Sequence, residues 1–233
     1  LSLLAMSCSS KKDPQGIIDR SIEAHGGNRI AQSHIQFDFR NRHYSFYKTN
    51  GLFKYTREFT DTLGKVSDVL TNSGLVRFIN GDTAKISIEK KAAYSNSVNS
   101  VIYFALLPYG LNDPAVRKTY FGETSIKNQS YYRIKITFDQ SGGGDDHEDV
   151  FLYWINKDHF TVDYFAYSYH TDGGGIRFRE AINRRTVMGV LFQDYINYKP
   201  KSELIPLDDL ETLFLANKLE RLSEINLENI VVQ

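Results

Sequence analysis

Acidic and histidine side chains gather in two loops of the chain, and they are its clearest candidates for metal chemistry. One loop carries Asp-Asp-His-Glu at 145–148, and the other carries His170 and Asp172. Carboxylate oxygens and imidazole nitrogens are ligands that divalent metal ions accept in proteins. The candidate metal ligands are therefore Asp145, His147, His170 and Asp172. Acidic residues beside glycines are also typical of solvated hairpin loops, and the spacing does not match an EF-hand.

A second candidate group is a pair of arginines that follows the second of these loops. Arg177 and Arg179 are two residues apart, so both side chains lie on one face if the segment is a strand. Two guanidinium groups placed in this way can hold a carboxylate or a phosphate through paired hydrogen bonds. The alternative is an ordinary cross-strand ion-pair ladder with Asp163 or Asp149.

The sequence lacks the common motifs of nucleophilic and nucleotide chemistry. It contains no G-x-S-x-G elbow, no P-loop and no H-E-x-x-H segment. Triple glycines occur at 142–144 and 173–175, but a nucleotide-binding loop lies between a strand and a helix, and both of these lie between strand-like segments. The residues alone therefore do not define an enzymatic activity.

Consecutive strands between Tyr131 and Tyr198 position these side chains. Alternation of apolar and polar residues predicts strands near 131–138, 150–154, 162–166, 176–178 and 190–196. Alternate loops of an antiparallel sheet lie at the same edge, because the chain reverses direction at every hairpin. We therefore expect the loops at 139–147 and 170–175 to share one edge. Earlier alternating segments predict further strands near 35–39, 53–59, 66–70, 75–79 and 84–88.

Two helices are expected among the strands. Asp13-Pro14 supplies an N-cap and a first-turn proline for a helix that ends at Gly26-Gly27. His25 lies at the end of this helix, where the helix dipole favours a protonated ring. A second helix is expected over 95–107, and it is apolar almost all round, so it requires burial on more than one side. It is either a core plug in the concave face of a curved sheet or a lid over a ligand.

The composition is that of a folded chain with no preference for nucleic acid. Hydrophobic residues make up 41% of the 233 residues, and 15 Tyr and 15 Phe can supply a substantial core. Lys and Arg balance Asp and Glu at 28 each, so no net field favours nucleic acid as a partner. No stretch approaches the ~20 apolar residues that span a bilayer.

The first residues resemble the end of a bacterial lipoprotein signal. Small residues precede Cys8, the only cysteine, after a short Leu-rich segment, although Ala5 stands where such signals favour Leu. The resemblance implies cleavage before Cys8 and acylation of that residue. We therefore expect a signal-peptide remnant at 1–7, a lipidated tether at 8–13 and one domain over 14–233. The expected partner is a membrane, through the lipid anchor.

Further motifs resemble two groups of bacterial envelope proteins. An opening helix with Glu-Ala-His-Gly-Gly at 23–27, curved antiparallel strands, a mid-chain apolar helix and Leu-Pro-x-Gly-Leu-Asn-Asp at 107–113 are similar to the lipoprotein-carrier half-barrel of the LolA/LolB type. The segments at 142–149, 153–154, 163–164, 174–180 and 194–195 resemble a family of envelope lipoproteins without an established activity. The resemblance implies a fold and a location in the bacterial envelope, expected at the outer membrane facing the periplasm or the surface. It assigns no catalytic residue.

These observations together predict an α+β fold and leave three hypotheses of function. The fold is a large curved antiparallel sheet, a half-barrel of about ten or eleven strands, with the N-terminal helix and the mid-chain helix against its concave face. The first hypothesis is a membrane-anchored lipoprotein that binds a lipid or acyl chain in the concave face. Its expected ligand-binding residues are Phe104, Leu107, Tyr132, Trp154, Tyr164, Arg177 and Arg179. The second is an envelope enzyme, such as a metal-assisted hydrolase, that uses 145–148 and 170–172. The third is a structural lipoprotein with no small ligand. No cofactor is required by the first hypothesis, and a divalent metal only by the second.

Overall fold

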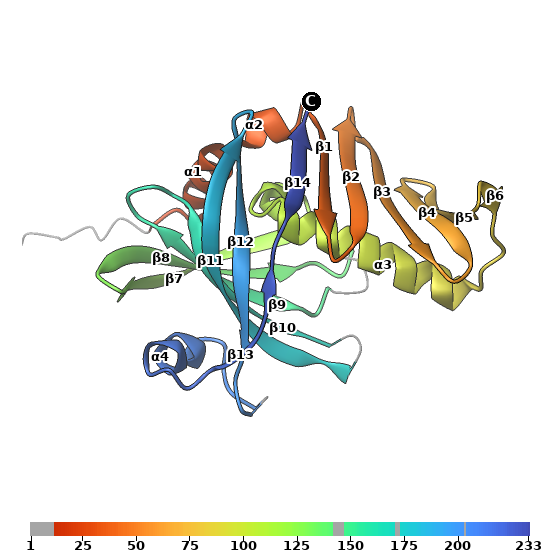
Figure 1. Ribbon diagram of the computed structural model, residues 1–233. Helices are drawn as coiled ribbons and strands as arrows, with labels where there is room; N and C mark the ends of the chain where they lie inside the picture. Colours follow the sequence, from red (N-terminus) through yellow and green to blue (C-terminus); the bar gives the residue numbers. More distant parts are fainter. Residues whose placement is uncertain (1–11, 142–146, 171–172, 203) are drawn as a thin grey trace, which may run out of the picture.

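The computed structural model describes residues 12–141, 147–170, 173–202 and 204–233, and within them the chain forms two open antiparallel sheets of seven strands each. Figure 1 shows the two sheets facing different directions, with one long helix passing between them. The strands alternate between inward apolar and outward polar residues over much of their length, as expected for antiparallel sheets covered on one side.

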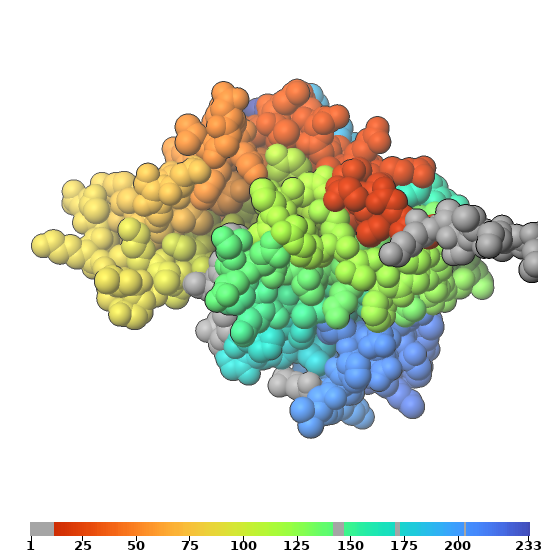
Figure 2. Space-filling view, turned by 180° about the vertical axis from the view of Figure 1, so that it is seen from behind, coloured from red at the N-terminus to blue at the C-terminus, as the bar shows by residue number. Residues whose placement is uncertain are grey.

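Sheet A contains the N-terminal strands and the last strand of the chain. Its order is β14 (Glu228–Val232), β1 (His34–Phe39), β2 (Arg42–Thr49), β3 (Leu52–Asp61), β4 (Gly64–Thr71), β5 (Gly74–Ile79) and β6 (Asp82–Thr83). Its inner face carries Phe37, Tyr44 and Phe46, which are buried. Figure 2 shows from behind that the yellow end of this sheet, with the start of the long helix, projects from the rest of the molecule.

Sheet B contains the strands expected between Tyr131 and Tyr198. Its order is β13 (Glu220–Ile225), β12 (Val190–Lys199), β11 (Gly175–Val187), β10 (Val162–Tyr169), β9 (Val150–Asn156), β8 (Gln129–Phe138) and β7 (Val116–Ile126). Ser168 of β10 pairs with Val150 of β9, and Tyr169 pairs with Gly175 of β11. The β8–β9 and β10–β11 loops therefore begin and end at one edge of the sheet, as predicted.

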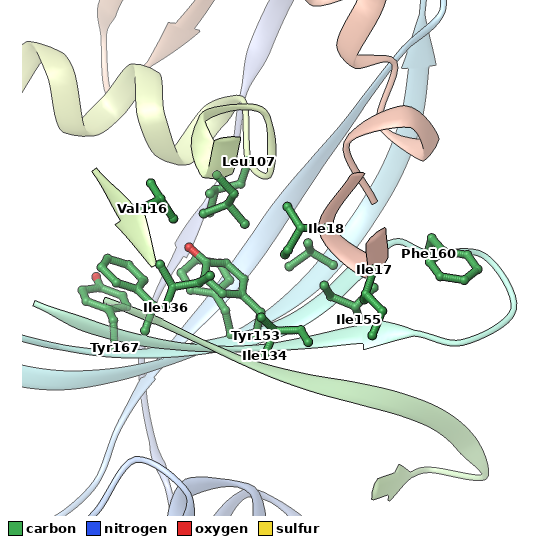
Figure 3. Close-up of a cluster of buried hydrophobic side chains, with 14 of the residues drawn as sticks. Ile17, Ile18, Leu107, Val116, Ile134, Ile136, Tyr153, Ile155, Phe160 and Tyr167 are labelled. Atoms are coloured by element: carbon green, nitrogen blue, oxygen red, sulfur yellow. The ribbon is translucent and has the colours of Figure 1, made fainter. Parts of the chain in front are cut away.

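The first helix, α1 (Pro14–Ala24), starts where the sequence predicts. The Asp13 side chain accepts a hydrogen bond from the Gln15 backbone N–H at 3.0 Å and so caps the helix. Ile17 and Ile18 point from α1 onto the strands of sheet B (Figure 3). A short helix α2 (Gly27–Ile30) follows Gly26, whose φ of +82° and close approach to the Gly189 carbonyl leave no room for a Cβ.

The long helix α3 (Ile88–Ala105) lies between the two sheets, and a 3₁₀ turn, η1 (Tyr109–Asn112), follows it. Val98 packs against the inner face of sheet A, Ile102 packs with residues of both sheets, and Phe104 stacks on Phe165 of sheet B. The expected burial on more than one side is therefore present. The helix begins at Ile88 rather than near residue 95, because the Ser87 hydroxyl accepts from the Lys90 N–H and caps it.

The strand predicted over 84–88 is consequently wrong. Ile86 precedes the helix as irregular chain and Ile88 is its first residue, so the alternation of Ala84, Ile86 and Ile88 came from a helix start rather than from a strand.

The short helix α4 (Asp209–Leu215) covers the outer face of sheet B. Leu210 and Phe214 pack there against Trp154, Tyr164 and Phe178. Strands β9 and β10 are therefore buried on both faces, which explains why almost every residue in them is buried.

The expectation of a single sheet of about ten or eleven strands differs from the structure. The described residues form fourteen strands in two sheets, because β2, β6 and β7 were not predicted and residues 220–232 form two further strands, β13 and β14. The chain leaves sheet B after β13 and enters sheet A at β14. Asp194 of β12 holds this crossing, since its Oδ1 accepts from the Leu227 N–H at 2.9 Å and from Arg185 Nη2 at 3.0 Å.

Candidate functional site

A cavity of about 210 Å³, here called the inter-sheet cavity, lies where α3 meets both sheets. Its apolar wall consists of Phe39, Val101, Phe104, Ala105, Ile225 and Leu227. Its polar wall consists of Arg40, Ser100, Arg179, Gln193, Tyr195 and Asn197. Among the described residues that line it there are two arginines and no aspartate or glutamate. The wall is therefore apolar on the helix side and cationic where β11 and the β1–β2 turn approach.

Arg179 is the most unusual side chain of this wall, because it is 8% exposed and forms no ion pair with a carboxylate of the described residues. Its Nη2 donates a hydrogen bond to the Tyr167 hydroxyl at 2.8 Å. The guanidinium lies 4.3 Å from the centre of the Phe104 ring and 5.3 Å from that of Phe165. In the described part of the chain, Arg179 Nε has no hydrogen-bond partner and no acidic side chain forms an ion pair with Arg179.

Asn197 lies directly opposite Arg179 in the register of β11 and β12. Its Oδ1 is buried and has no hydrogen-bond partner among the described residues. Gln193 on the same strand is satisfied, because its Nε2 donates to the Val162 carbonyl at 2.7 Å and to the Tyr195 hydroxyl at 2.6 Å. Both of these unpartnered atoms are themselves buried, although their residues line the cavity.

Two tyrosines near Arg179, Tyr153 and Tyr195, are neutral at physiological pH. Burial raises the pKa of Tyr195 to about 12, although the hydrogen bond from Gln193 and the charge of Arg179 oppose this effect. Burial likewise raises the pKa of Tyr153 well above its ordinary value, with the neighbouring Tyr103 hydroxyl adding to the effect. Neither hydroxyl can ionise near neutral pH, so neither neutralises the guanidinium of Arg179.

The residues expected to bind a ligand are divided between the two faces of sheet B. Phe104 and Arg179 line the inter-sheet cavity. Leu107 and Tyr132 lie on the same inner face, packed in the cluster with α1 that Figure 3 shows in part. Arg177 is half-buried and donates to the Tyr169 hydroxyl at 2.6 Å, outside the cavity wall.

Trp154 and Tyr164 are on the opposite, outer face of the sheet, packed under α4. Trp154 is fully buried, and its Nε1 donates a hydrogen bond to Glu211 Oε2. In β9 and β10 the residues on both faces of the sheet are mostly apolar. The alternation pattern therefore does not indicate which face lines the cavity.

At the edge formed by the β8–β9 and β10–β11 loops, one predicted metal ligand, His170, lies near Asp149, which was not among the predicted ligands. His170 is exposed, and its Nδ1 lies 3.7 Å from Oδ1 of Asp149. His147 is half-buried, whereas Asp145 and Asp172 lie outside the described residues. The described residues contain no group of three or more His, Cys, Asp and Glu side chains that could hold a metal ion. Cys8 also lies outside the described residues.

His25 differs from the sequence-based expectation. It is buried at the end of α1, and burial, together with the charge of Arg184, lowers its pKa to about 3. The expected protonation by the helix dipole is therefore wrong, because desolvation outweighs it. The neutral ring has a structural role instead, since Nε2 accepts a hydrogen bond from the Val162 N–H at 3.2 Å.

Sequence analysis did not select Arg40, Gln193 or Asn197 for the site. Gln193, Tyr195 and Asn197 alternate along β12, so their period of two indicates a shared polar face within an apolar segment. Arg40 lies in the β1–β2 turn with φ of +50°, and only the three-dimensional fold places it at the cavity.

No helix in the described part of the chain is both long enough and apolar enough to span a membrane. Comparison with known protein families gives a match, over residues 1–227, to a model described as a family of unknown function (DUF6503). Comparison with the curated proteins gives no match.

Three solved structures share the fold across nearly the whole chain. A LolA superfamily protein from Nitrosomonas europaea has a TM-score of 0.50 and 12% identity, covering 96% of this chain and 94% of its own. A DUF1329 family protein from Desulfovibrio piger has a TM-score of 0.55 and 11% identity, covering 94% and 93%. A domain from Vibrio parahaemolyticus named for outer membrane lipoprotein sorting has a TM-score of 0.50 and 8% identity, covering 95% and 94%. These likenesses confirm the LolA-like fold predicted from the sequence.

Proposed function

The chain belongs to the DUF6503 family, whose description gives no function, and we propose that this protein is a lipid-anchored envelope lipoprotein that binds a hydrophobic ligand in the inter-sheet cavity. The LolA-like fold and the name of the Vibrio neighbour support a role with lipids or lipoproteins in the bacterial envelope. The proposed anchor is Cys8, with residues 8–13 as the tether and 14–233 as the binding domain.

The observation that carries the proposal is the inter-sheet cavity beside Phe104. Protein interiors are close-packed, so a space of about 210 Å³ that opens to the surface beside Arg40 can accommodate a small ligand. Six of the side chains around it are apolar, so a water cluster would find few hydrogen-bond partners on that side. An alkyl chain satisfies such a wall, because each buried methylene contributes about 0.8 kcal/mol.

The experiment is native mass spectrometry of the purified protein, combined with displacement of an apolar fluorescent probe by single-chain lipids. Ala105 lines the cavity from α3, so Ala105→Phe should fill it and abolish both probe binding and any co-purifying lipid. Ala92 is exposed on the first turns of the same helix, and Ala92→Phe is the matched control that should bind normally. Equal binding by both variants, or no binding by the wild type, would contradict the proposal.

The metal-assisted hydrolase is a second proposal, favoured by one observation. His170 and Asp149 approach to 3.7 Å from two different loops, so the predicted edge does gather an imidazole and a carboxylate. Addition of Zn²⁺ or Ca²⁺ should then raise the melting temperature of the wild type and not of His170→Ala. Unchanged melting of the wild type with both metals would remove this function.

A further inference from the structure

We infer that the ligand of the inter-sheet cavity is a single-chain amphiphile with a carboxylate head, bound with that carboxylate on Arg179 and with its chain along α3. This inference rests on the proposed function and adds the chemical class of the ligand. It starts from an imbalance of charge inside the protein.

Three arginines are buried in the described part of the chain, and two of them share one aspartate. Arg57 and Arg77 both donate to the Asp68 carboxylate, at 2.7 to 3.0 Å. Arg179 has no such partner, although it is buried as deeply as Arg77. Leaving a buried cation without a counter-charge is costly, so the pairing of the other two is the ordinary arrangement and Arg179 is the exception.

Aromatic rings compensate the charge of Arg179 only in part. The Phe104 ring lies 4.3 Å from the guanidinium carbon, within the range of a cation–π contact. That contact uses the face of the guanidinium and supplies no full negative charge. A carboxylate in the cavity would accept a charge-assisted hydrogen bond from the Arg179 guanidinium and supply the missing negative charge.

The entrance of the inter-sheet cavity is positively charged, as is its interior. Arg40 lines the cavity and is exposed, so the cavity reaches the surface near the β1–β2 turn. A second cation at the opening attracts an anionic head and lowers the barrier to its entry.

The test compares four ligands with one ten-carbon chain length, by displacement of an apolar probe at pH 7.5: decanoate, 3-hydroxydecanoate, decanol and methyl decanoate. We expect decanoate and 3-hydroxydecanoate, which share the carboxylate, to bind more tightly than decanol and the ester. Arg179→Met keeps an apolar stem and should weaken decanoate by roughly 10- to 100-fold, with decanol unchanged. Arg179→Lys keeps a positive charge and should restore part of the loss. If Arg179→Met does not fold, Arg179→Lys is compared with the wild type instead. Lysine cannot form the paired hydrogen bonds of a guanidinium, so this variant should still lose affinity for decanoate and not for decanol.

Arg177→Met is the matched control, since Arg177 is on the same strand but outside the cavity wall and should leave all four affinities unchanged. Equal affinity for decanoate and decanol, or an Arg179→Met variant that binds decanoate normally, would overturn the inference that the ligand has a carboxylate head. Either result would leave the proposed apolar site in place. Failure of all four ligands to displace the probe would instead count against the proposed function.

Discussion

Trp154 in β9 donates a hydrogen bond from its indole Nε1 to Oε2 of Glu211 in α4, at 2.7 Å. The other carboxylate oxygen of Glu211, Oε1, accepts a hydrogen bond from the Thr124 hydroxyl of β7. Arg133 Nη1 of β8 lies 3.9 Å from Oε2. One buried carboxylate therefore connects three strands of sheet B to the helix that covers them. This contact holds the outer face of the sheet whose inner face lines the cavity.

The first prediction concerns this contact. Glu211→Ala leaves the buried indole N–H without an acceptor, and we expect the free energy of unfolding to fall by about 1.5–3 kcal/mol, as for other hydrogen bonds to charged groups. Trp154 is the only tryptophan in the chain, so its emission should also shift to longer wavelength as α4 loosens. Denaturant unfolding followed by fluorescence measures both effects. Asp209→Asn, at an exposed position of the same helix, is the control and should change neither.

The second prediction concerns the buried ion cluster that joins sheet A to α3. Asp68 is fully buried and accepts from Arg57 and Arg77, while Arg57 also donates to the Ser97 hydroxyl of α3 at 2.7 Å. Burial alone would raise the pKa of Asp68, but the hydrogen bonds and charges of Arg77 and Arg57 hold it below its ordinary value. Asp68→Asn leaves two guanidinium groups uncompensated and should cost about 3–5 kcal/mol.

Amide hydrogen exchange would show which elements lose stability in Asp68→Asn. Exchange should accelerate in β4, β5 and the first half of α3, because Arg77 also lies 3.5 Å from the Tyr94 ring centre. The control is Glu220→Gln, which removes an exposed pair with Lys199 and should cost no more than about 1 kcal/mol. A loss for Asp68→Asn no larger than for this control would mean that the cluster does not stabilise the fold.

The third prediction is a dependence of stability on pH that comes from His25. The folded pKa is about 3 and the unfolded value is the ordinary 6.5, so between these values the unfolded chain binds a proton that the folded protein does not. His25 therefore destabilises the protein progressively as the pH falls below 6.5, by about 1.4 kcal/mol per pH unit. At pH 5 the expected loss relative to pH 8 is about 2 kcal/mol.

His25→Gln keeps an acceptor for the Val162 N–H and does not titrate, so this contribution should vanish from its stability profile. Urea unfolding at several pH values measures the difference between the two proteins. His159→Gln, at an exposed position, serves as the control. Parallel profiles for wild type and His25→Gln would show that His25 is not held neutral by burial.

Local patterns in the sequence predicted the elements that depend on neighbouring residues. Asp13-Pro14 predicted the start of α1, and the hairpin rule placed the loops after β8 and β10 at one edge. Phe104 and Arg179 were both selected from their own segments, and both line the inter-sheet cavity. In each case the signal lies within a few residues of the position that it describes.

Contacts between distant segments were not accessible to the same reasoning. Trp154 and Tyr164 were assigned to the cavity because alternation cannot distinguish two apolar faces, and α4 covers the outer one from fifty residues further along the chain. Arg40 and Asn197 meet at the cavity only because the chain crosses from β13 to β14 and brings the two sheets together around α3.

The last prediction uses Phe104 as a partition between two spaces. Phe104 and Ser100 line both the inter-sheet cavity and a neighbouring cavity of about 130 Å³, whose wall also includes Phe138 and Phe151. Phe104→Ala should join the two and cost about 3 kcal/mol of stability, the lower end for loss of a phenylalanine side chain. The joined cavity should accept a longer alkyl chain than the wild type.

Binding of a series of single-chain carboxylates from eight to sixteen carbons would measure this change. Each further methylene that is buried contributes about 0.8 kcal/mol, or roughly fourfold in affinity, until the cavity is full. The affinity of the wild type should therefore level off at a shorter chain than that of Phe104→Ala. Phe53→Ala also removes a partly buried ring, but Phe53 packs against Tyr55 and lines neither cavity, so the chain-length preference of this variant should match that of the wild type. The same preferred length in Phe104→Ala and wild type would mean that the alkyl chain does not run past Phe104.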